Sequence, residues 1–323
     1  MKKVDAKEAA QLLLAQDNIV IFAHRKPDGD AIGSCFGLYY ALKSLGKRVR
    51  VECADPLLVG RYATIFGAYE PEEFAPDFLV TADVADLGLL AGVHEKYGRP
   101  INLCIDHHPS NNFYAEHTLL AMTGAAAELV YLVIAAMGVV PDKTIANAIF
   151  MGLTTDTGCF RFPNATAQTH RIAAEMLDYG AESALINRLM FLTNTRGRLA
   201  VEKTLMDTIT YHFDDRCAMA FLPGDILERF QVREEELEGI SGLVNTIEGV
   251  YAGVTIRERA DGTYRVSLRT KDPVNASRIC AALGGGGHKN AAGCVLAADM
   301  GIDKAKETLL TVVEHEINEA FDS

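Results

Sequence analysis

The sequence predicts an α/β protein with a doubly wound, mainly parallel sheet in its N-terminal domain and a smaller α/β domain after it. Three observations support this prediction. Short apolar runs alternate with helical patterns as far as Ile105, the pattern changes after about Tyr211, and the 323-residue chain is long enough for two domains. With 49% hydrophobic residues, the chain can bury a sizeable core in each.

Four apolar runs in the N-terminal third predict buried strands, because each is short and ends near polar residues. These runs are Ile19–Ala23, Val49–Cys53, Phe78–Asp83 and Ile101–Ile105. Helical patterns separate them, as in the βαβ units of a parallel sheet. The preceding segment, MKKVDAKEAAQLLLAQ, predicts an amphipathic helix rather than a signal peptide, since its apolar stretch is short and carries acidic residues.

The rest of the chain divides into a helical part and a second α/β part. Helices are predicted at 124–137, 142–154, 167–179, 183–192 and 199–207. Strands follow at 217–222, 249–258 and 263–270, the last two joined by Asp261-Gly262, a strong hairpin signal. Helices at 275–283 and 303–320 complete this part. We therefore expect two domains, at 1–192 and 206–323, joined by a linker at 193–205.

Composition excludes several classes of protein. A net charge of −12 argues against a protein that coats long nucleic acid, although a short phosphorylated ligand needs only a local positive site. No segment approaches the roughly 18 uninterrupted apolar residues of a membrane span. The seven cysteines form no CxxC pair and mostly lie in apolar contexts, which predicts reduced thiols. We expect a cytoplasmic protein without membrane association.

Polar clusters stand at the ends of three predicted strands and in one later loop. They are His24, Asp28 and Asp30; Asp83 with Asp86; Asp106, His107 and His108; and Asp156 in TTDTG. The carboxyl ends of strands in an open α/β sheet border one crevice, where ligands bind. These side chains are therefore expected to converge.

Each cluster taken alone has a structural explanation, since Asp28 or Asp30 can cap a helix and Asp106 can serve a turn. Together these explanations fail, because clustered carboxylates repel one another unless a cation neutralises them. Mixed carboxylate and imidazole ligands suit divalent cations, and two such ions a few ångströms apart can bracket a displacement at phosphorus. The residues therefore predict a two-metal phosphoesterase.

Five ordered motifs resemble those of the DHH phosphoesterase superfamily. HRKPDGDAIGS, ADVAD, DHH and TDTG resemble the motifs of its catalytic domain, and GGGGHKNAAG at 284–293 is similar to the signature of the DHH-associated C-terminal domain. The length and two-domain layout most resemble the branch that degrades very short RNA and dephosphorylates 3′-phosphoadenosine 5′-phosphate (pAp). Close relatives hydrolyse cyclic di-AMP or its linear product pApA.

The resemblance implies a role for each motif residue. Two Mn²⁺ ions, or alternatively Mg²⁺ or Co²⁺, would be held by His24 and Asp28 at the first position, by Asp30, His107 and Asp156 at the second, and by Asp83 bridging both. His108 would contact the phosphoryl oxygens, with Asp106 orienting the imidazoles. The chain departs from many relatives at 86–90, where DLGLL replaces a segment with an arginine. A homodimer is common among relatives.

The glycine run at 284–287 exceeds what a helix cap requires. A backbone without Cβ atoms can approach a phosphate closely and direct successive N–H groups at it, so Gly285, Gly286 and Gly287 are predicted to bind substrate. Arg269 and His288 are predicted to hold its terminal phosphate or base, in a segment that is locally basic. Arg265 and Arg278 could equally be solvated, and Asn164 could cap a helix near Thr166 or contact substrate.

Other activities remain open at this stage. A cyclic di-AMP phosphodiesterase, or a pyrophosphatase or polyphosphatase, would use the same metals, although the glycine signature argues against the latter. A RecJ-like exonuclease would be longer, and a non-enzymatic nucleotide sensor would be favoured by a missing metal ligand. The partner we expect is a short single-stranded RNA or small nucleotide, not a long duplex.

Overall fold

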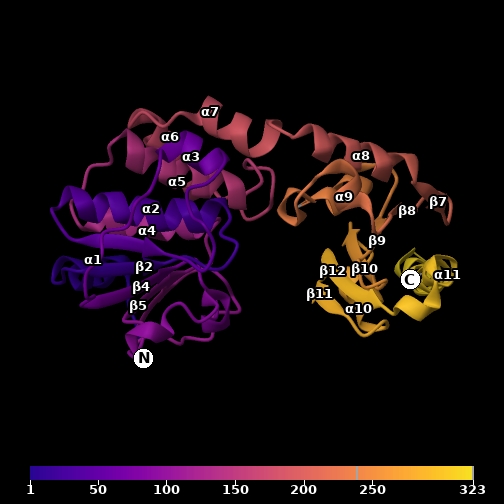
Figure 1. The fold of residues 1–323 in the computed structure, drawn as a ribbon, viewed down its shortest axis with the longest axis horizontal. Coiled ribbons are helices and arrows are strands. Elements are labelled where there is room, and N and C mark those ends of the chain that lie inside the picture. The colour runs from indigo at the N-terminus through magenta and orange to yellow at the C-terminus, as the bar shows by residue number, and fades with distance from the viewer. Residues whose placement is uncertain (238, 322–323) are drawn as a thin grey trace. The chain divides into compact units, whose positions relative to one another are not determined.

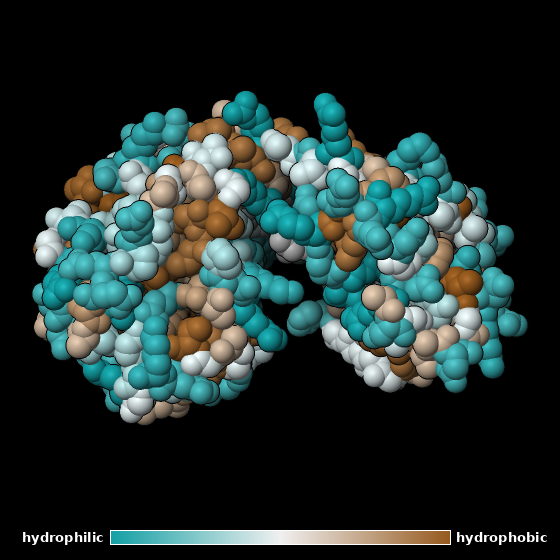
Figure 2. All heavy atoms as spheres, in the orientation of Figure 1, coloured by the Kyte–Doolittle hydropathy of each residue, from teal (hydrophilic) through white to brown (hydrophobic). Residues whose placement is uncertain are grey.

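The computed structural model describes residues 1–237 and 239–321. The chain divides into two compact units, unit 1 at Met1–Thr193 and unit 2 at Asn194–Ser323 (Figure 1). Within the described residues, no helix combines the length and apolar content that crossing a bilayer requires. Figure 2 shows hydrophilic side chains over most of the visible surface, interrupted by small apolar patches.

Unit 1 is built on a six-stranded parallel sheet in the order β1-β6-β5-β4-β2-β3. Its strands are β1 (Lys2–Lys3), β2 (Ile19–Phe22), β3 (Val49–Glu52), β4 (Phe78–Ala82), β5 (Leu103–Asp106) and β6 (His117–Leu120). The four predicted strands are confirmed. Strands β1 and β6 escape the prediction because short polar segments such as Lys2–Lys3 carry no apolar run.

The two faces of this sheet are covered differently. Ile19 and Ile21 of β2 enter a core shared with the α-helices, whereas Val20 and Phe22 enter a smaller core on the other face. The helices of the larger core are α1 (Ala6–Leu14), α2 (Gly29–Ser44), α3 (Arg61–Phe66), α4 (Ala126–Ala136), α5 (Lys143–Asp156), α6 (Ala167–Asp178) and α7 (Ser183–Asn187), the last continued by a π-helical turn at Arg188–Leu192. Among the described residues, the smaller core is closed by loops and the 3-10 helices η1 (Leu87–Leu90) and η2 (Glu95–Tyr97). The predicted α/β class is confirmed.

Unit 2 contains a mixed six-stranded sheet in the order β11-β12-β10-β9-β8-β7, in which β8 and β9 are parallel. Its strands are β7 (Thr210–His212), β8 (Cys217–Leu222), β9 (Ala252–Glu258), β10 (Tyr264–Thr270), β11 (Gly286–His288) and β12 (Ala291–Leu296). The predicted hairpin joins β9 to β10, where Gly262 has φ +78° and the Thr263 N–H donates to Asp261 Oδ1 at 2.9 Å.

Helices pack on this sheet and leave part of it open. They are α8 (Arg196–Asp207), α9 (Ile226–Phe230), α10 (Ala276–Ala281) and α11 (Ile302–Phe321), with 3-10 helices η4 (Glu234–Leu237), η5 (Ile240–Thr246) and η6 (Ala298–Met300). The segment expected as a linker, 193–205, includes most of α8, whose Val201 and Leu205 join a core with β8. Val266 and Leu268 of β10 enter the core that contains α10 and α11, so Ser267 and Arg269 face the other way.

Candidate active site

The predicted metal ligands follow three neighbouring strands of unit 1. Strands β2, β4 and β5 lie side by side in the parallel sheet, so their carboxyl ends share one edge. His24 and Asp28 follow β2, Asp83 follows β4, and His107 follows β5. Helices supply the remaining two ligands, since Asp30 lies in the first turn of α2 and Asp156 is the last residue of α5.

The predicted ligand atoms form two groups, and a third group joins Asp83 and His107 to His108; within each group all the atoms lie within 4.8 Å of one another. In the first ligand group, Nε2 of His24 lies 3.9 Å from Asp28 Oδ1 and 3.7 Å from Asp83 Oδ2. In the second ligand group, formed by Asp30, His107 and Asp156, Nε2 of His107 lies 3.9 Å from Asp30 Oδ2 and 3.7 Å from Asp156 Oδ2.

Asp83 faces both groups. Its second carboxylate oxygen, Oδ1, lies 3.6 Å from Nε2 of His107 and 3.6 Å from Nδ1 of His108. That oxygen is buried and has no hydrogen-bond partner among the described residues. Separations of 3.6–3.9 Å are too long for hydrogen bonds. They suit ligands of a shared cation, which at about 2.1 Å from each ligand atom separates two ligands by about 3–4 Å.

Both imidazoles in these groups are oriented by a backbone carbonyl. Nδ1 of His24 lies 2.9 Å from the Arg25 carbonyl oxygen, and Nδ1 of His107 lies 3.1 Å from that of Thr123. A carbonyl oxygen only accepts hydrogen bonds, so each Nδ1 carries the proton and each Nε2 presents a lone pair. The lone pairs are directed to the carboxylates, as required of metal-binding histidines.

The electrostatics of the carboxylates also favour a cation. Asp30 and Asp83 are only 1% and 3% exposed, and burial raises the pKa of both carboxyl groups well above the ordinary range. Neighbouring carboxylates raise these pKa values further, since like charges oppose ionisation. Burial likewise raises the pKa of Asp156, partly offset by His107. Full ionisation of this cluster therefore calls for compensating positive charge.

Asp28 and Asp30 serve the backbone as well as the ligand groups. Asp28 is the N-cap of α2, and its Oδ1 accepts from the N–H groups of Asp30 and Ala31, both at 3.0 Å. Asp30 accepts from the N–H groups of Ala126 at 2.6 Å and Ala127 at 3.0 Å. Capping by Asp28 therefore does not exclude a ligand role for either residue.

The Asp106–His108 pair lies beside the second ligand group. Asp106 is fully buried, and its carboxylate accepts from His108 Nδ1 at 2.8 Å and from Asn111 Nδ2 at 2.6 Å. Burial alone would raise the pKa of Asp106, but these hydrogen bonds prevail and lower it. The hydrogen bond to Asp106 raises the pKa of His108, whose ring is half-exposed.

In unit 2, the predicted substrate residues share one face of the sheet. Arg269 pairs with Ala291, which also pairs with His288, so the three form a row across β10, β12 and β11. The next row on this face is Ser267, Gly293 and Gly286. We call these six residues the unit 2 platform. Burial lowers the pKa of Arg269, whose guanidinium donates to the Leu268 carbonyl at 3.0 Å.

The glycine run does not form the expected phosphate-binding loop. Gly286–His288 form the edge strand β11, whose N–H groups alternate in direction instead of converging on one anion. A Cβ at Gly285 would lie 2.3 Å from the Gly293 carbonyl oxygen, and one at Gly287 would lie 2.6 Å from that of Ala291. At Gly286, a Cβ would meet nothing within 4 Å in the described structure. Packing therefore requires Gly285 and Gly287 but not Gly286.

Two polar residues near the ligands have roles that the sequence does not reveal. The N-cap of α6 is Thr166, so the expected cap at Asn164 is wrong. The Asn164 amide instead donates to the Gly124 carbonyl at 2.9 Å and to the Asp156 carbonyl at 3.2 Å. Asp86 caps η1 by accepting from the Gly88 N–H at 2.7 Å and lies outside both ligand groups.

Other side chains occupy supporting positions. Ser34 donates to Asp30 Oδ1 at 3.1 Å, a contact that its i+4 spacing on a helix could have indicated. Arg278 lies 3.9 Å from Glu316, and Arg265 lies 3.8 Å from Glu234, so acids balance part of the basic segment. Asn111 has no signal in the sequence, because its contact with Asp106 depends on the turn that follows β5.

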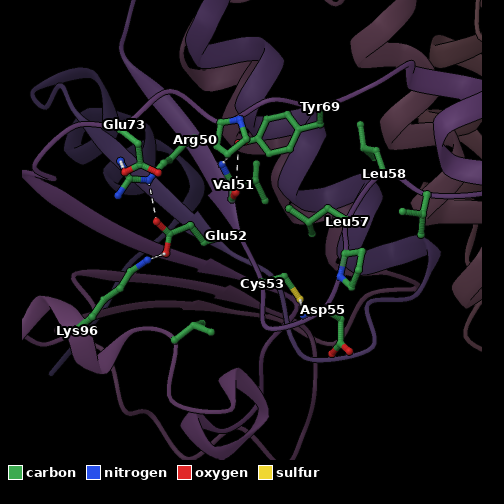
Figure 3. A pocket seen from close by; sticks show the side chains of 14 residues that line it. Arg50, Val51, Glu52, Cys53, Asp55, Leu57, Leu58, Tyr69, Glu73 and Lys96 are labelled. Carbon is green, nitrogen blue, oxygen red and sulfur yellow. Dashed lines mark hydrogen bonds and ion pairs between the residues drawn. The ribbon is translucent and has the colours of Figure 1, made fainter.

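A pocket of about 430 Å³ lies beside the edge strand β3 and contains none of the predicted ligands (Figure 3). Arg50 and Lys96 both pair with Glu52 there, at 2.7 Å and 2.9 Å. The pocket reaches the His24 loop through Cys53, whose thiol donates to the His24 carbonyl at 3.2 Å. All seven cysteines lie in the described part of the chain and are free thiols.

The fold and site together define a phosphoric ester hydrolase, in which strand ends of a parallel sheet and two helices bring four carboxylates and two imidazoles into two adjoining groups suited to divalent cations. The chain belongs to the DHH family: residues 18–153 match the DHH family, N-terminal domain, and residues 215–319 match the DHHA1 domain. The resemblance inferred from the motifs is confirmed.

Relatives extend over nearly the whole chain. It is 37% identical, over 96% of its length and 94% of the relative, to a bifunctional oligoribonuclease and PAP phosphatase, NrnA, of Thermus thermophilus. It is 26% identical to the Bacillus subtilis protein of that name, over 96% and 99% of the two chains. A solved structure of an exopolyphosphatase-related protein from Bacteroides fragilis has the same fold, with a TM-score of 0.84 at 24% identity, covering 96% of this chain and 95% of that one.

Proposed function

We propose that this protein hydrolyses very short oligoribonucleotides, including pApA, and removes a phosphate from pAp, using two Mn²⁺ ions in unit 1. The observation that carries the chemistry is the Asp83 carboxylate, whose two oxygens face the first and second ligand groups. The substrates are proposed from the relatives named as oligoribonucleases and PAP phosphatases, which match nearly the full chain.

His24 and Asp28 would hold one ion, Asp30, His107 and Asp156 the other, and Asp83 would bridge them. When bound, such a pair of divalent cations supplies a nucleophile at neutral pH and neutralises charge at phosphorus. The protein contributes fixed ligand positions. Its carboxylates stay ionised when bound cations compensate their negative charge, and His24 and His107 keep their protons on Nδ1.

His108 is proposed to contact the phosphoryl oxygens of the substrate. Its Nδ1 is committed to Asp106, which leaves Nε2 as the group that meets the substrate. The Asp106 carboxylate raises the pKa of His108, and a protonated ring would donate from Nε2 to the phosphoryl oxygens, where charge develops. Asp106 is buried and bonded to Asn111 as well, so it acts by orienting His108.

The unit 2 platform is proposed to bind the end of the substrate. Arg269 and His288 flank Ala291 in one row, so a phosphate between them would meet a guanidinium and an imidazole. Small residues fill the rest of the platform, which lets a ligand approach the backbone. Gly286 supports this proposal, since packing alone does not require a glycine there.

A substrate panel tests the proposal. The purified protein with Mn²⁺ would receive pAp, pApA, an RNA pentanucleotide, a much longer RNA, cyclic di-AMP and pyrophosphate, and products would be separated by chromatography. We expect turnover of pAp, pApA and the pentanucleotide. Turnover of pyrophosphate alone would contradict the substrate assignment. The Asp83→Asn variant, purified identically, controls for contaminating nucleases, and ultracentrifugation of the sample tests the expected homodimer.

A further inference from the structure

Glu128 is a buried acid that the proposed reaction does not use. It lies in the first turn of α4, is 2% exposed, and accepts hydrogen bonds at Oε1 from the Gly124 N–H at 3.1 Å and from the Thr169 hydroxyl. Thr169 is itself fully buried. Because burying a carboxylate is costly, its position between a loop and a neighbouring helix calls for an explanation.

Residues 123–127 are the end of the loop before α4 and the first two residues of α4; this segment, which we call the 123–127 loop, contacts two members of the second ligand group directly. The Thr123 carbonyl accepts from His107 Nδ1 at 3.1 Å, which fixes the tautomer of that imidazole. The N–H groups of Ala126 and Ala127 donate to the two carboxylate oxygens of Asp30, at 2.6 Å and 3.0 Å. A shift of the loop would therefore move both ligands.

The third member, Asp156, is connected to the same loop through Asn164. The Asn164 amide donates to the Gly124 carbonyl at 2.9 Å and to the Asp156 carbonyl at 3.2 Å, and it lies 3.5 Å from Asp156 Oδ2. The packing around Gly124 has no room for a side chain, because a Cβ there would lie 2.8 Å from both Glu128 Oε1 and Thr169 Oγ1.

The first ligand group is supported by other segments. His24 is oriented by the Arg25 carbonyl, and Asp28 by the N–H groups that begin α2. Asp83 follows β4, and its N–H donates to the Ile105 carbonyl at 2.9 Å. The contacts of the 123–127 loop therefore distinguish the second ligand group from the first.

We infer that Glu128, together with Thr169, is a positioning residue for the second ligand group. Glu128 holds the 123–127 loop so that Asp30, His107 and Asp156 face one point, and it touches neither metal nor substrate. This inference rests on the proposed metal pair. It implies that loss of the Glu128–Thr169 contact weakens one metal position and spares the other.

The experiment compares Thr169→Val with Thr118→Val, two substitutions of similar shape at fully buried threonines of unit 1. The hydroxyl of Thr118 has no hydrogen-bond partner in the described structure, so Thr118→Val controls for loss of a buried hydroxyl. The Thr169 hydroxyl also accepts from the Thr166 N–H at 3.0 Å in the capping box of α6, so the Glu128→Gln variant, which keeps that box, is measured beside it. Metal-free protein would be titrated with Mn²⁺ by calorimetry and electron paramagnetic resonance. We expect Thr169→Val to bind one of two Mn²⁺ ions about 10–100-fold more weakly, while Thr118→Val matches the wild type.

Turnover and a conservative variant sharpen the test. Excess Mn²⁺ should restore kcat in Thr169→Val and leave KM unchanged. The Glu128→Gln variant should bind Mn²⁺ nearly as the wild type does, because its amide oxygen can still accept hydrogen bonds from the Gly124 N–H and the Thr169 hydroxyl. Equal Mn²⁺ affinities in Thr169→Val and Thr118→Val would overturn the inference, as would equal weakening of both positions. A wild type that binds no Mn²⁺ would contradict the metal pair of the proposed function, and this inference with it.

Discussion

The two ligand groups of unit 1 and the platform of unit 2 are built on opposite principles. In unit 1, the charged side chains are mostly buried. Asp30, for example, accepts hydrogen bonds from two backbone N–H groups and from the Ser34 hydroxyl. In unit 2, His288 is exposed on an edge strand, and Arg269 is partly buried among small residues. The ligand groups are therefore acidic and held by hydrogen bonds, whereas the platform is basic and partly exposed.

This difference indicates a division of tasks. Chemistry at phosphorus depends on reacting groups held to a fraction of an ångström, which requires supporting hydrogen bonds. Recognition of a ligand that varies in length needs charge and access more than fixed geometry. Substitutions in unit 1 should therefore change kcat, and substitutions on the platform should change KM.

Chelation should produce the largest effect and act on unit 1. We expect EDTA to reduce turnover to background, because the buried carboxylates lose their compensating charge. Hydrogen exchange followed by mass spectrometry would locate the effect, and removal of Mn²⁺ should raise exchange in peptides at 19–31 and 103–127 while leaving 264–293 unchanged. Full activity after exhaustive chelation would show that turnover needs no metal ion, which contradicts the proposed role of the ligand groups.

Asp83→Asn should have the next largest effect, with opposite consequences for activity and stability. We expect kcat to fall at least about 10³-fold, since both ligand groups lose their shared carboxylate. The melting temperature of the metal-free protein should rise, because the variant removes a buried charge beside other acids. Asp83 has φ +62°, a conformation that asparagine adopts readily, so the backbone should be preserved.

Asp86→Asn is the matched control for that variant, because Asp86 lies in the same loop outside the ligand groups. Asparagine can keep the cap of η1, so turnover and melting temperature should stay near those of the wild type. Retention of wild-type turnover by Asp83→Asn, assayed beside this control, would exclude the bridging role.

The convergence of the proposed metal ligands was predictable because their signal is local and the rule that unites them is general. Each ligand follows a recognisable strand or lies in a short motif, and parallel strands bring their carboxyl ends to one edge. His24 and Asp28 are only four residues apart, and the Asp106–His108 contact spans two residues. Contacts between residues so close in the sequence can be recognised before the fold is known.

The supporting contacts and the platform were not predictable in the same way. Asn164 meets Gly124 across forty residues, and Glu128 meets Thr169 across forty-one, distances at which no pattern links the partners. The glycine run was assigned to a phosphate-binding loop because a backbone without Cβ atoms can approach a phosphate, yet pairing with β12 places Gly286 and Gly287 in an edge strand. Tertiary packing decided each of these cases.

Arg269→Ala should weaken substrate binding without altering the chemistry. Loss of a charged hydrogen bond to phosphate should raise KM for pAp about 10–100-fold and leave kcat nearly unchanged. Arg278→Ala is the matched control, because Arg278 belongs to α10 and lies near Glu316 instead of the platform. Steady-state kinetics of both variants would measure the difference, and an unchanged KM in Arg269→Ala would reject Arg269 as a phosphate contact.

Gly286→Ala should have the smallest effect and the most specific one. A methyl group there meets no described atom within 4 Å, so the melting temperature should not fall, whereas Gly285→Ala should lower it by driving Cβ against the Gly293 carbonyl. If ligand reaches the backbone of β11, the Gly286 methyl group should still raise KM a few-fold. Wild-type KM in Gly286→Ala would confine recognition to the side chains of Arg269 and His288.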